Sequence, residues 1–156
     1  MLLVDFRDLQ RGPVETVGTV LPEDEALQGL GLGLTQPLEI RGKLQTMADG
    51  EIYWRGAISG EIRGICGRCL IEVTRPVKAE VDALFSTDPE AADDPGVYLL
   101  AARATHVDLR PVVREEVALT VPAYLLCKEN CAGLCPRCGA DLNQGPCECA
   151  AAEARL

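Results

Sequence analysis

The chain has 156 residues, enough for one domain with a short appendage and a buried core. Hydrophobic residues make up 47% and charged residues 25%, which excludes wholesale disorder, and aromatic residues at 4% leave the core to Val, Leu, Ile and Ala. The net charge of −9 excludes indiscriminate binding to a phosphate backbone, because such binding needs an excess of Lys and Arg.

The N-terminal region, residues 1–37, has no clear hydrophobic period. Asp5 and Asp8 interrupt its apolar start before it could serve as a signal peptide, and no run in the sequence approaches the roughly 18 apolar residues that span a membrane. We therefore expect a cytoplasmic protein. The glycine-rich stretch at 27–34 lacks the flanking strand and helix of a phosphate-binding loop, so it is predicted to be a flexible connection.

Between Leu38 and about Phe85 apolar residues recur at every second position, which is typical of half-buried strands. Three such segments are expected, at about 38–44, 52–62 and 71–85. Asp49-Gly50 between the first two predicts a hairpin. Glycines in the middle segment suit bulges and sharp coiling. The fold class is expected to be mainly β (α+β), a small antiparallel barrel-like sheet or bent meander with one or two short helices.

After this region the sequence predicts an acidic loop at 87–96, a short strand at 97–101 and a helix over about Leu109–Leu119. Asp108 would cap that helix, and Pro122 would end it. A β-rich core domain is expected over 1–126, and a cysteine-rich metal-binding tail over 127–156.

The eight cysteines fall in close pairs, and stable disulfides are rare in the cytoplasm. Cys135-Pro-Arg-Cys138-Gly has the two-residue spacing that lets one metal take both thiolates from a tight turn. Four thiolates favour zinc or an iron–sulfur cluster. All eight are therefore predicted metal ligands: Cys66, Cys69, Cys127, Cys131, Cys135, Cys138, Cys147 and Cys149.

Eight sulfurs suggest two metal sites with four thiolate ligands each. The alternative is a single site, with the other four cysteines not bound to metal. One or two Zn²⁺ ions are therefore expected per chain. The partners of Cys135 and Cys138 come either from the other tail cysteines or from Cys66 and Cys69. Cys66-Gly-Arg-Cys69 lies at a predicted hairpin tip, which suits a zinc knuckle. A redox dithiol is the rival interpretation, but that chemistry needs a helix after the first thiol, and strands flank this pair.

No catalytic constellation is expected. His106 is the sole histidine, and a closed shell of four thiolates leaves no open position for an activated water.

Basic residues concentrate in one region of this acidic chain. Residues 41–78 hold seven Lys and Arg against four Asp and Glu. Such a region can bind RNA locally, and the acidic remainder of the chain can bind a basic protein. The candidate RNA- or partner-binding residues are Arg55, Arg63, Arg68 and Arg75, although Arg75 falls in phase with the apolar Val73 and Val77.

Several motifs, in order, resemble those of the YceD family, named for large ribosomal RNA subunit accumulation. They are Asp5–Leu9, Cys66-Gly-Arg-Cys69-Leu70, Val107-Asp-Leu-Arg-Pro111 with Arg114-Glu-Glu116, Gly133-Leu-Cys-Pro-Arg-Cys-Gly-Ala-Asp-Leu-Asn143, and Cys147-Glu-Cys149. The resemblance implies a bacterial or plastid factor without assigned enzymatic activity that supports 23S rRNA synthesis or processing and large-subunit accumulation.

Its implied partners are pre-large-subunit rRNA, a ribosomal protein, or both, with no membrane and no small-molecule substrate. Two alternatives stay open. One is a thiol-disulfide oxidoreductase that uses Cys66 and Cys69, and the other is a zinc-ribbon protein-interaction module in transcription.

Overall fold

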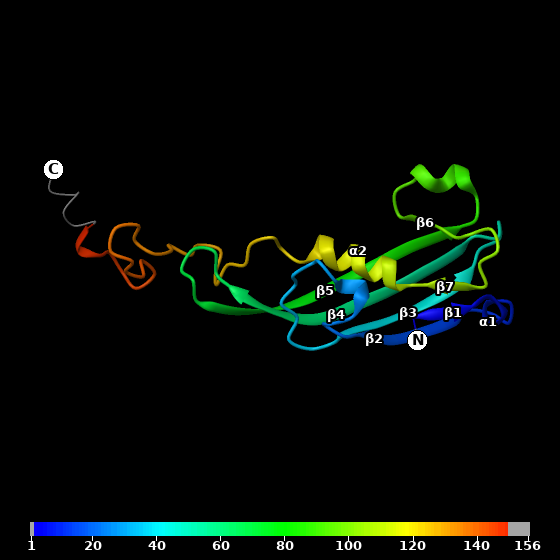
Figure 1. The fold of residues 1–156 in the computed structure, drawn as a ribbon, viewed down its shortest axis with the longest axis horizontal. Coiled ribbons are helices and arrows are strands. Elements are labelled where there is room, and N and C mark those ends of the chain that lie inside the picture. The colour runs from blue at the N-terminus through cyan, green and yellow to red at the C-terminus, as the bar shows by residue number, and fades with distance from the viewer. Residues whose placement is uncertain (1, 150–156) are drawn as a thin grey trace. The chain divides into compact units, whose positions relative to one another are not determined.

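The computed structural model describes residues 2–149 of the chain. These residues form two compact units, here called the sheet unit (residues 2–62 and 76–121) and the knuckle unit (residues 63–75 and 122–149). Strands β4 (Ile52–Ile65) and β5 (Glu72–Ser86) supply residues to both (Figure 1). The boundary between 1–126 and 127–156 stays a prediction.

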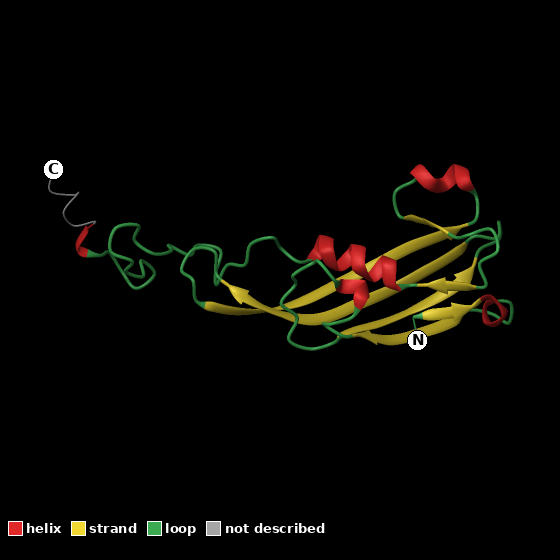
Figure 2. Cartoon of the chain, viewed as in Figure 1, coloured by secondary structure: helices red, strands yellow, loops and turns green. Residues whose placement is uncertain are grey.

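The main sheet has five strands in the order β2-β3-β4-β5-β6 (Figure 2). Strand β2 (Val14–Val20) pairs antiparallel with β3 (Leu38–Thr46), and β3 pairs antiparallel with β4. Strand β6 (Val97–Leu99) instead pairs parallel with β5, which the expected antiparallel meander did not include. A separate two-stranded sheet joins β1 (Leu3–Asp5) antiparallel to β7 (His106–Asp108).

The prediction of a mainly β fold is confirmed, but the barrel-like alternative is wrong for the described residues. Closure would require β2 and β6 to pair, and they form the two edges of the sheet. Strand β6 offers only three residues, already paired with β5, which leaves little backbone to close a barrel.

Within residues 2–147 the helices are short. They are α1 (Phe6–Leu9), α2 (Arg110–Thr120) and the 3₁₀ turns η1 (Glu25–Leu27) and η2 (Pro89–Asp93). Helix α2 lies within one residue of its predicted range and buries Val112, Val113 and Val117. The N-cap is Leu109 rather than the predicted Asp108, although the side chain of Asp108, one residue earlier, accepts the backbone N–H of Arg110 at 3.0 Å. No helix in the described part of the chain is long and apolar enough to cross a membrane.

The predicted hairpin at Asp49-Gly50 joins β3 to β4. The N–H of Met47 donates to the carbonyl of Glu51 at 2.7 Å, and Gly50 has a φ of +88°. Glycine adopts this left-handed conformation without the steric penalty of a side chain. The register pairs Thr46 with Ile52 and keeps Leu44 and Trp54 opposite each other.

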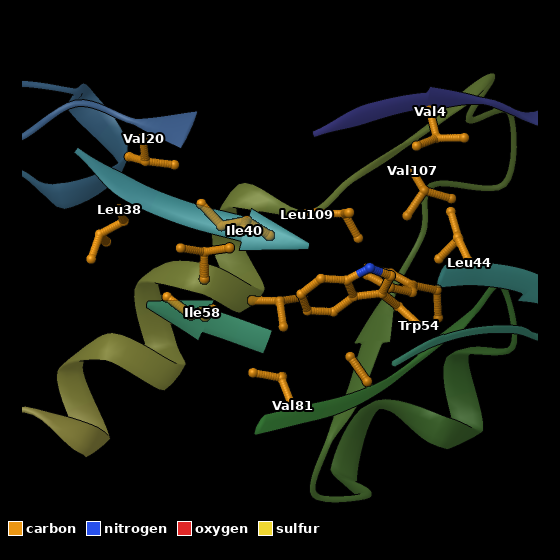
Figure 3. Close-up of a cluster of buried hydrophobic side chains, with 14 of the residues drawn as sticks. Val4, Val20, Leu38, Ile40, Leu44, Trp54, Ile58, Val81, Val107 and Leu109 are labelled. Carbon is orange, nitrogen blue, oxygen red and sulfur yellow. The ribbon is translucent and has the colours of Figure 1, made fainter. Parts of the chain in front are cut away.

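The core of the sheet unit surrounds Trp54, which is fully buried (Figure 3). Its indole N–H donates to the buried hydroxyl of Thr16 at 2.9 Å. The Trp54 ring leaves no space for a side chain at two neighbouring glycines. A Cβ on Gly56 would lie 2.3 Å from Trp54 Cζ2, and a Cβ on Gly42, which pairs with Gly56, would lie 2.7 Å from Trp54 Nε1. The glycines of the middle strands therefore make room for the ring.

Two N-terminal features differ from the prediction. Strand β2 was not expected, and the glycine-rich stretch packs against the core through Leu30, Leu32 and Leu34 rather than acting as a bare connection. Leu34 also forms a β-bridge to Ile62.

Candidate metal centres

The first thiol group consists of Cys66, Cys69, Cys127 and Cys131. Cys66 and Cys69 lie at the hairpin tip between β4 and β5, and the other two lie in the tail. The four Sγ atoms lie within 4.8 Å of one another. Sγ of Cys66 is 3.8 Å from that of Cys131, and Sγ of Cys69 is 3.6 Å from that of Cys127. Three of the four residues are buried, Cys127 being the exception.

The second thiol group consists of Cys135, Cys138, Cys147 and Cys149, all from the tail. Their Sγ atoms also lie within 4.8 Å of one another, but only Cys135 is buried and Cys138 is exposed. The structure thus gathers the eight predicted ligands into two sets of four. Metal ligation itself stays a prediction.

The distances within the first group fit a metal better than disulfides. A tetrahedron of thiolates about 2.3 Å from a zinc ion has sulfur–sulfur edges of about 3.8 Å. A disulfide would need about 2.05 Å. The measured separations of 3.8 and 3.6 Å match the tetrahedral edge, and all eight cysteines are free.

The two Cys-x-x-Cys segments fold into the same turn. In each, the N–H of the first cysteine donates to the carbonyl five residues later, Cys66 to Ile71 at 2.9 Å and Cys135 to Ala140 at 2.8 Å. In each, the residue after the second cysteine donates back to the first, Leu70 to Cys66 at 3.0 Å and Gly139 to Cys135 at 2.9 Å. That residue has a positive φ in both turns, +64° at Leu70 and +75° at Gly139.

These turns aim backbone N–H groups at the first sulfur. The N–H of Cys69, helped by that of Arg68, lowers the pKa of Cys66 to about 6 against the effect of burial. The N–H groups of Cys138 and Arg137 likewise lower the pKa of Cys135 to about 6. Thiolate is the form that binds a metal, so each turn prepares its first cysteine for ligation.

One thiol in each group shows the opposite tendency. Burial raises the pKa of Cys127 to about 12, and the hydrogen bond with the Cys138 side chain raises that of Cys149 to about 12. Four negative charges so close together repel one another unless a cation lies among them. Each group is therefore suited to ionise fully only around a metal.

Two of the arginines predicted to bind RNA or a partner donate hydrogen bonds to tail carbonyls, and their predicted binding role stays a prediction. Arg75 Nη2 donates to the carbonyls of Leu126 at 2.8 Å and Cys127 at 2.7 Å. Arg68 Nη1 donates to the carbonyl of Cys131 at 3.0 Å and, more weakly, to that of Glu129 at 3.4 Å. Sequence reasoning missed this supporting role, because the acceptors are backbone atoms more than 50 residues away.

The other two arginines face solvent. The side chain of Arg55 is 72% exposed, with its Nε 3.6 Å from Asp82, and that of Arg63 is 57% exposed, with its Nε 3.7 Å from Glu72. Arg55 belongs to the sheet unit and Arg63 to the knuckle unit. Exposed ion pairs of this kind contribute little to stability and leave both guanidinium groups accessible.

The redox interpretation of Cys66 and Cys69 finds little support in their surroundings. The pair lies in a hairpin tip rather than at the start of a helix, and two more thiols complete the group. His106, the sole histidine, lies exposed in β7, 3.8 Å from Asp5.

Comparison with known proteins identifies the family. Residues 54–155, more than half of the chain, match the family model described as "Large ribosomal RNA subunit accumulation protein YceD". The chain belongs to the YceD family. This confirms the resemblance found in the sequence.

The similar proteins are distant. An uncharacterized protein of Mycobacterium tuberculosis is 27% identical over 111 residues, which cover 70% of this chain and 53% of that protein. The uncharacterized protein YlbN of Bacillus subtilis is 28% identical over 109 residues, covering 67% of this chain and 60% of that protein. This chain thus matches only about half the length of its mycobacterial relative. No solved structure matches it.

Proposed function

We propose that this YceD family member is a non-enzymatic factor in ribosome biogenesis that holds two Zn²⁺ ions and supports 23S rRNA synthesis or processing and large-subunit accumulation. The metal part is supported by one observation: four thiols meet twice, each time around the same backbone turn. The rRNA part is supported by the family's description.

Zinc is the metal that suits these groups, because it takes four thiolates in a closed tetrahedral shell. Bound there, it would supply the ligation free energy that orders a segment with few apolar residues. Cys66, Cys69, Cys127 and Cys131 would hold one ion, and the second thiol group the other. A closed shell offers no position for an activated water, which favours a structural role.

Metal analysis tests this part. Protein purified without chelator should be colourless and contain two zinc ions per chain. Less than about half an equivalent of zinc, or the absorption of an iron–sulfur cluster, would contradict it. Mutants that lack one group, Cys66→Ser/Cys69→Ser or Cys138→Ser/Cys149→Ser, should each retain one ion.

We propose that the partner is pre-large-subunit rRNA in the cytoplasm, which binds to the exposed Arg55 and Arg63. Their guanidinium groups are accessible, whereas those of Arg68 and Arg75 already donate to tail carbonyls. We therefore assign Arg68 and Arg75 a lesser share of any RNA contact. Phosphate contacts of this kind weaken as salt rises, roughly in proportion to the charges neutralised.

Co-sedimentation with pre-large-subunit particles tests the partner. Arg55→Glu/Arg63→Glu should abolish it with little change in thermal stability. The matched control is Arg11→Glu/Arg103→Glu, which makes the same charge change at two exposed arginines outside the basic region. If the Arg55 and Arg63 variant still co-sediments, the contact is between a ribosomal protein and the acidic part of the chain outside residues 41–78. If the unmodified protein never co-sediments, a zinc-ribbon role in transcription replaces the proposal.

The lowered pKa of Cys66 would also suit the oxidoreductase alternative. Thiol titration separates the two, because zinc-bound thiols do not cycle between thiol and disulfide. Titration with and without a denaturing chelator should expose all eight thiols only when the chelator is present. Rapid reaction of Cys66 and Cys69 in the zinc-loaded protein would favour the oxidoreductase.

A further inference from the structure

The segment that joins the two thiol groups is short and held from both sides. Three residues separate Cys131, of the first group, from Cys135, of the second. On one side, the N–H of Leu134 donates to the carbonyl of Arg68 at the hairpin tip, at 3.2 Å. On the other, the carbonyl of Gly133 accepts the N–H of Leu142 at 2.9 Å. Leu142 lies in the loop between Cys138 and Cys147, so the loop of the second group contacts the segment that joins the two groups.

Asn143 in that loop makes the closest approach to the first group. Its Oδ1 accepts the N–H of Ala132 at 2.8 Å, and its Nδ2 donates toward Sγ of Cys131 at 3.5 Å. The Nδ2 also donates to Oδ1 of Asp141 at 2.7 Å. A carboxylate only accepts, so Asp141 fixes which end of the amide faces the sulfur. Asp141 is itself held by the N–H of Asn143 at 2.9 Å.

We infer that Asn143 is a positioning residue for the first metal site that the loop of the second site supplies, so that filling one site strengthens binding at the other. This inference rests on the proposed function, because both groups must bind zinc. Nδ2 stabilises the negative sulfur of Cys131, and Oδ1 fixes the backbone beside it. Such outer contacts typically change metal affinity by about 10- to 100-fold.

The link between the sites follows from where the loop is anchored. Residues 139–146 lie between Cys138 and Cys147, so closure of the second group around a metal fixes both ends of the loop. A zinc ion there orders the loop and presents Asn143 to Cys131. Thermodynamic linkage then requires that zinc in the first group strengthen binding in the second by the same factor.

Site-specific zinc occupancy tests this inference. Alkylation of Cys66 and Cys69, followed by peptide mass spectrometry across a series of zinc buffers, reports the first group alone. The four proteins to compare are the unmodified chain, Asn143→Ala, Cys138→Ser/Cys149→Ser, and the combination of all three changes. Asn143→Ala and the loss of the second group should each weaken the first site by about 10- to 100-fold. Combined, they should weaken it little further, because both remove the same contact.

Two variants separate positioning from general damage. Gln144→Ala removes a side chain of the same loop that donates to Asp141 at 3.4 Å, and it should leave the first site unchanged. Asn143→Asp keeps the size and the acceptor for Ala132 but loses the donor to sulfur and adds a negative charge beside it, so it should weaken the site at least as much as alanine does. Trp54 fluorescence should show the sheet unit unaltered in every variant.

Each other outcome overturns the inference in a recognisable way. Additive effects of Asn143→Ala and the second-group mutation would mean that the sites are independent, although both bind zinc. Unchanged affinity in Asn143→Ala or Asn143→Asp would remove the role of the amide. An unmodified protein that binds no zinc would instead refute the proposed function, and the inference with it.

Discussion

The sheet unit and the knuckle unit are ordered by different forces. The sheet unit buries a continuous apolar cluster around Trp54, Ile40 and Val81. In the knuckle unit the buried cluster consists of Val73 and three cysteines, with Leu126 and Leu134 partly buried beside them. Burial of apolar area can stabilise the first, but it offers too little to the second. The contrast shows that cysteines occupy most of the buried positions in the knuckle unit, where the sheet unit has apolar side chains.

Removal of the metal is the experiment with the largest expected effect on the difference between the two units. Chelation should make the tail at 127–149 protease-sensitive, because structural zinc typically contributes about 10–16 kcal/mol to the folding of a small metal site. Cys135→Ser/Cys138→Ser should do the same for residues 132–149, while the first group keeps its ion. The sheet unit should survive, as judged by the fluorescence of Trp54, the only tryptophan. A tail that stays protected without metal would show that it has another source of stability.

The converse experiment damages the apolar core alone. Gly56→Ala would place a Cβ 2.3 Å from the Trp54 ring, so the sheet unit should lose about 1–3 kcal/mol in urea unfolding. Zinc content should not change. Ala57→Ser, at an exposed position next to it, serves as the control and should have almost no effect. Zinc loss in Gly56→Ala at low urea would mean that the two units do not keep separate sources of stability.

The two Cys-x-x-Cys turns differ in the residue that adopts the positive φ. Leu70 has a φ of +64° and is 63% exposed, so Leu70→Gly should relieve strain and stabilise the first group by about 1 kcal/mol. Gly139→Ala should do the reverse in the second group, where nothing lies within 4 Å of the added Cβ. The midpoint of a chelator titration measures both. Equal behaviour of the two variants would mean that strain at this position does not affect metal retention.

The smallest effect is expected at Tyr98 in the sheet unit. Its hydroxyl donates to Glu115 at 2.7 Å, and Tyr98→Phe should cost no more than about 1 kcal/mol at neutral pH. Burial and the Glu115 carboxylate raise the pKa of Tyr98. A raised pKa contributes stability below about pH 10, the unfolded value, and this contribution is lost as pH rises further. The difference from Tyr98→Phe should therefore shrink above pH 10, and a difference that grows there would contradict the assignment.

Much of the sheet could be predicted because its long strands alternate. The inward positions of β4 are Ile52, Trp54, Ile58 and Ile62, and the periodicity is visible in the sequence. Strand β2 was missed for a physical reason. Two of its inward positions hold Thr16 and Gly18 rather than large apolar residues, and Thr16 is buried because it accepts the indole N–H of Trp54. A polar residue buried by such a contact has no signature in hydrophobic periodicity.

The candidate ligands could also be predicted, but not their division into groups. Spacing marks Cys66 with Cys69 and Cys135 with Cys138 as pairs. That Cys127 and Cys131 join the first pair depends on the folded hairpin, 58 and 65 residues away. The hydrogen bonds of Arg75 could not be predicted either, because backbone carbonyl acceptors have no sequence signature.

The cysteines of the first group lie far apart in the chain, so they are synthesised at different times. Cys66 and Cys69 leave the ribosome well before Cys127, 58 residues after Cys69. At about 5–20 residues per second, this interval lasts about 3–12 s. The last two strands of the main sheet, β5 and β6, emerge within that time, while the tip holds two thiols without their partners. Until the tail arrives, the nascent chain thus exposes a two-thiol half-site that is open to oxidants and competing metals, and rapid collapse of the sheet would shorten the search when Cys127 appears.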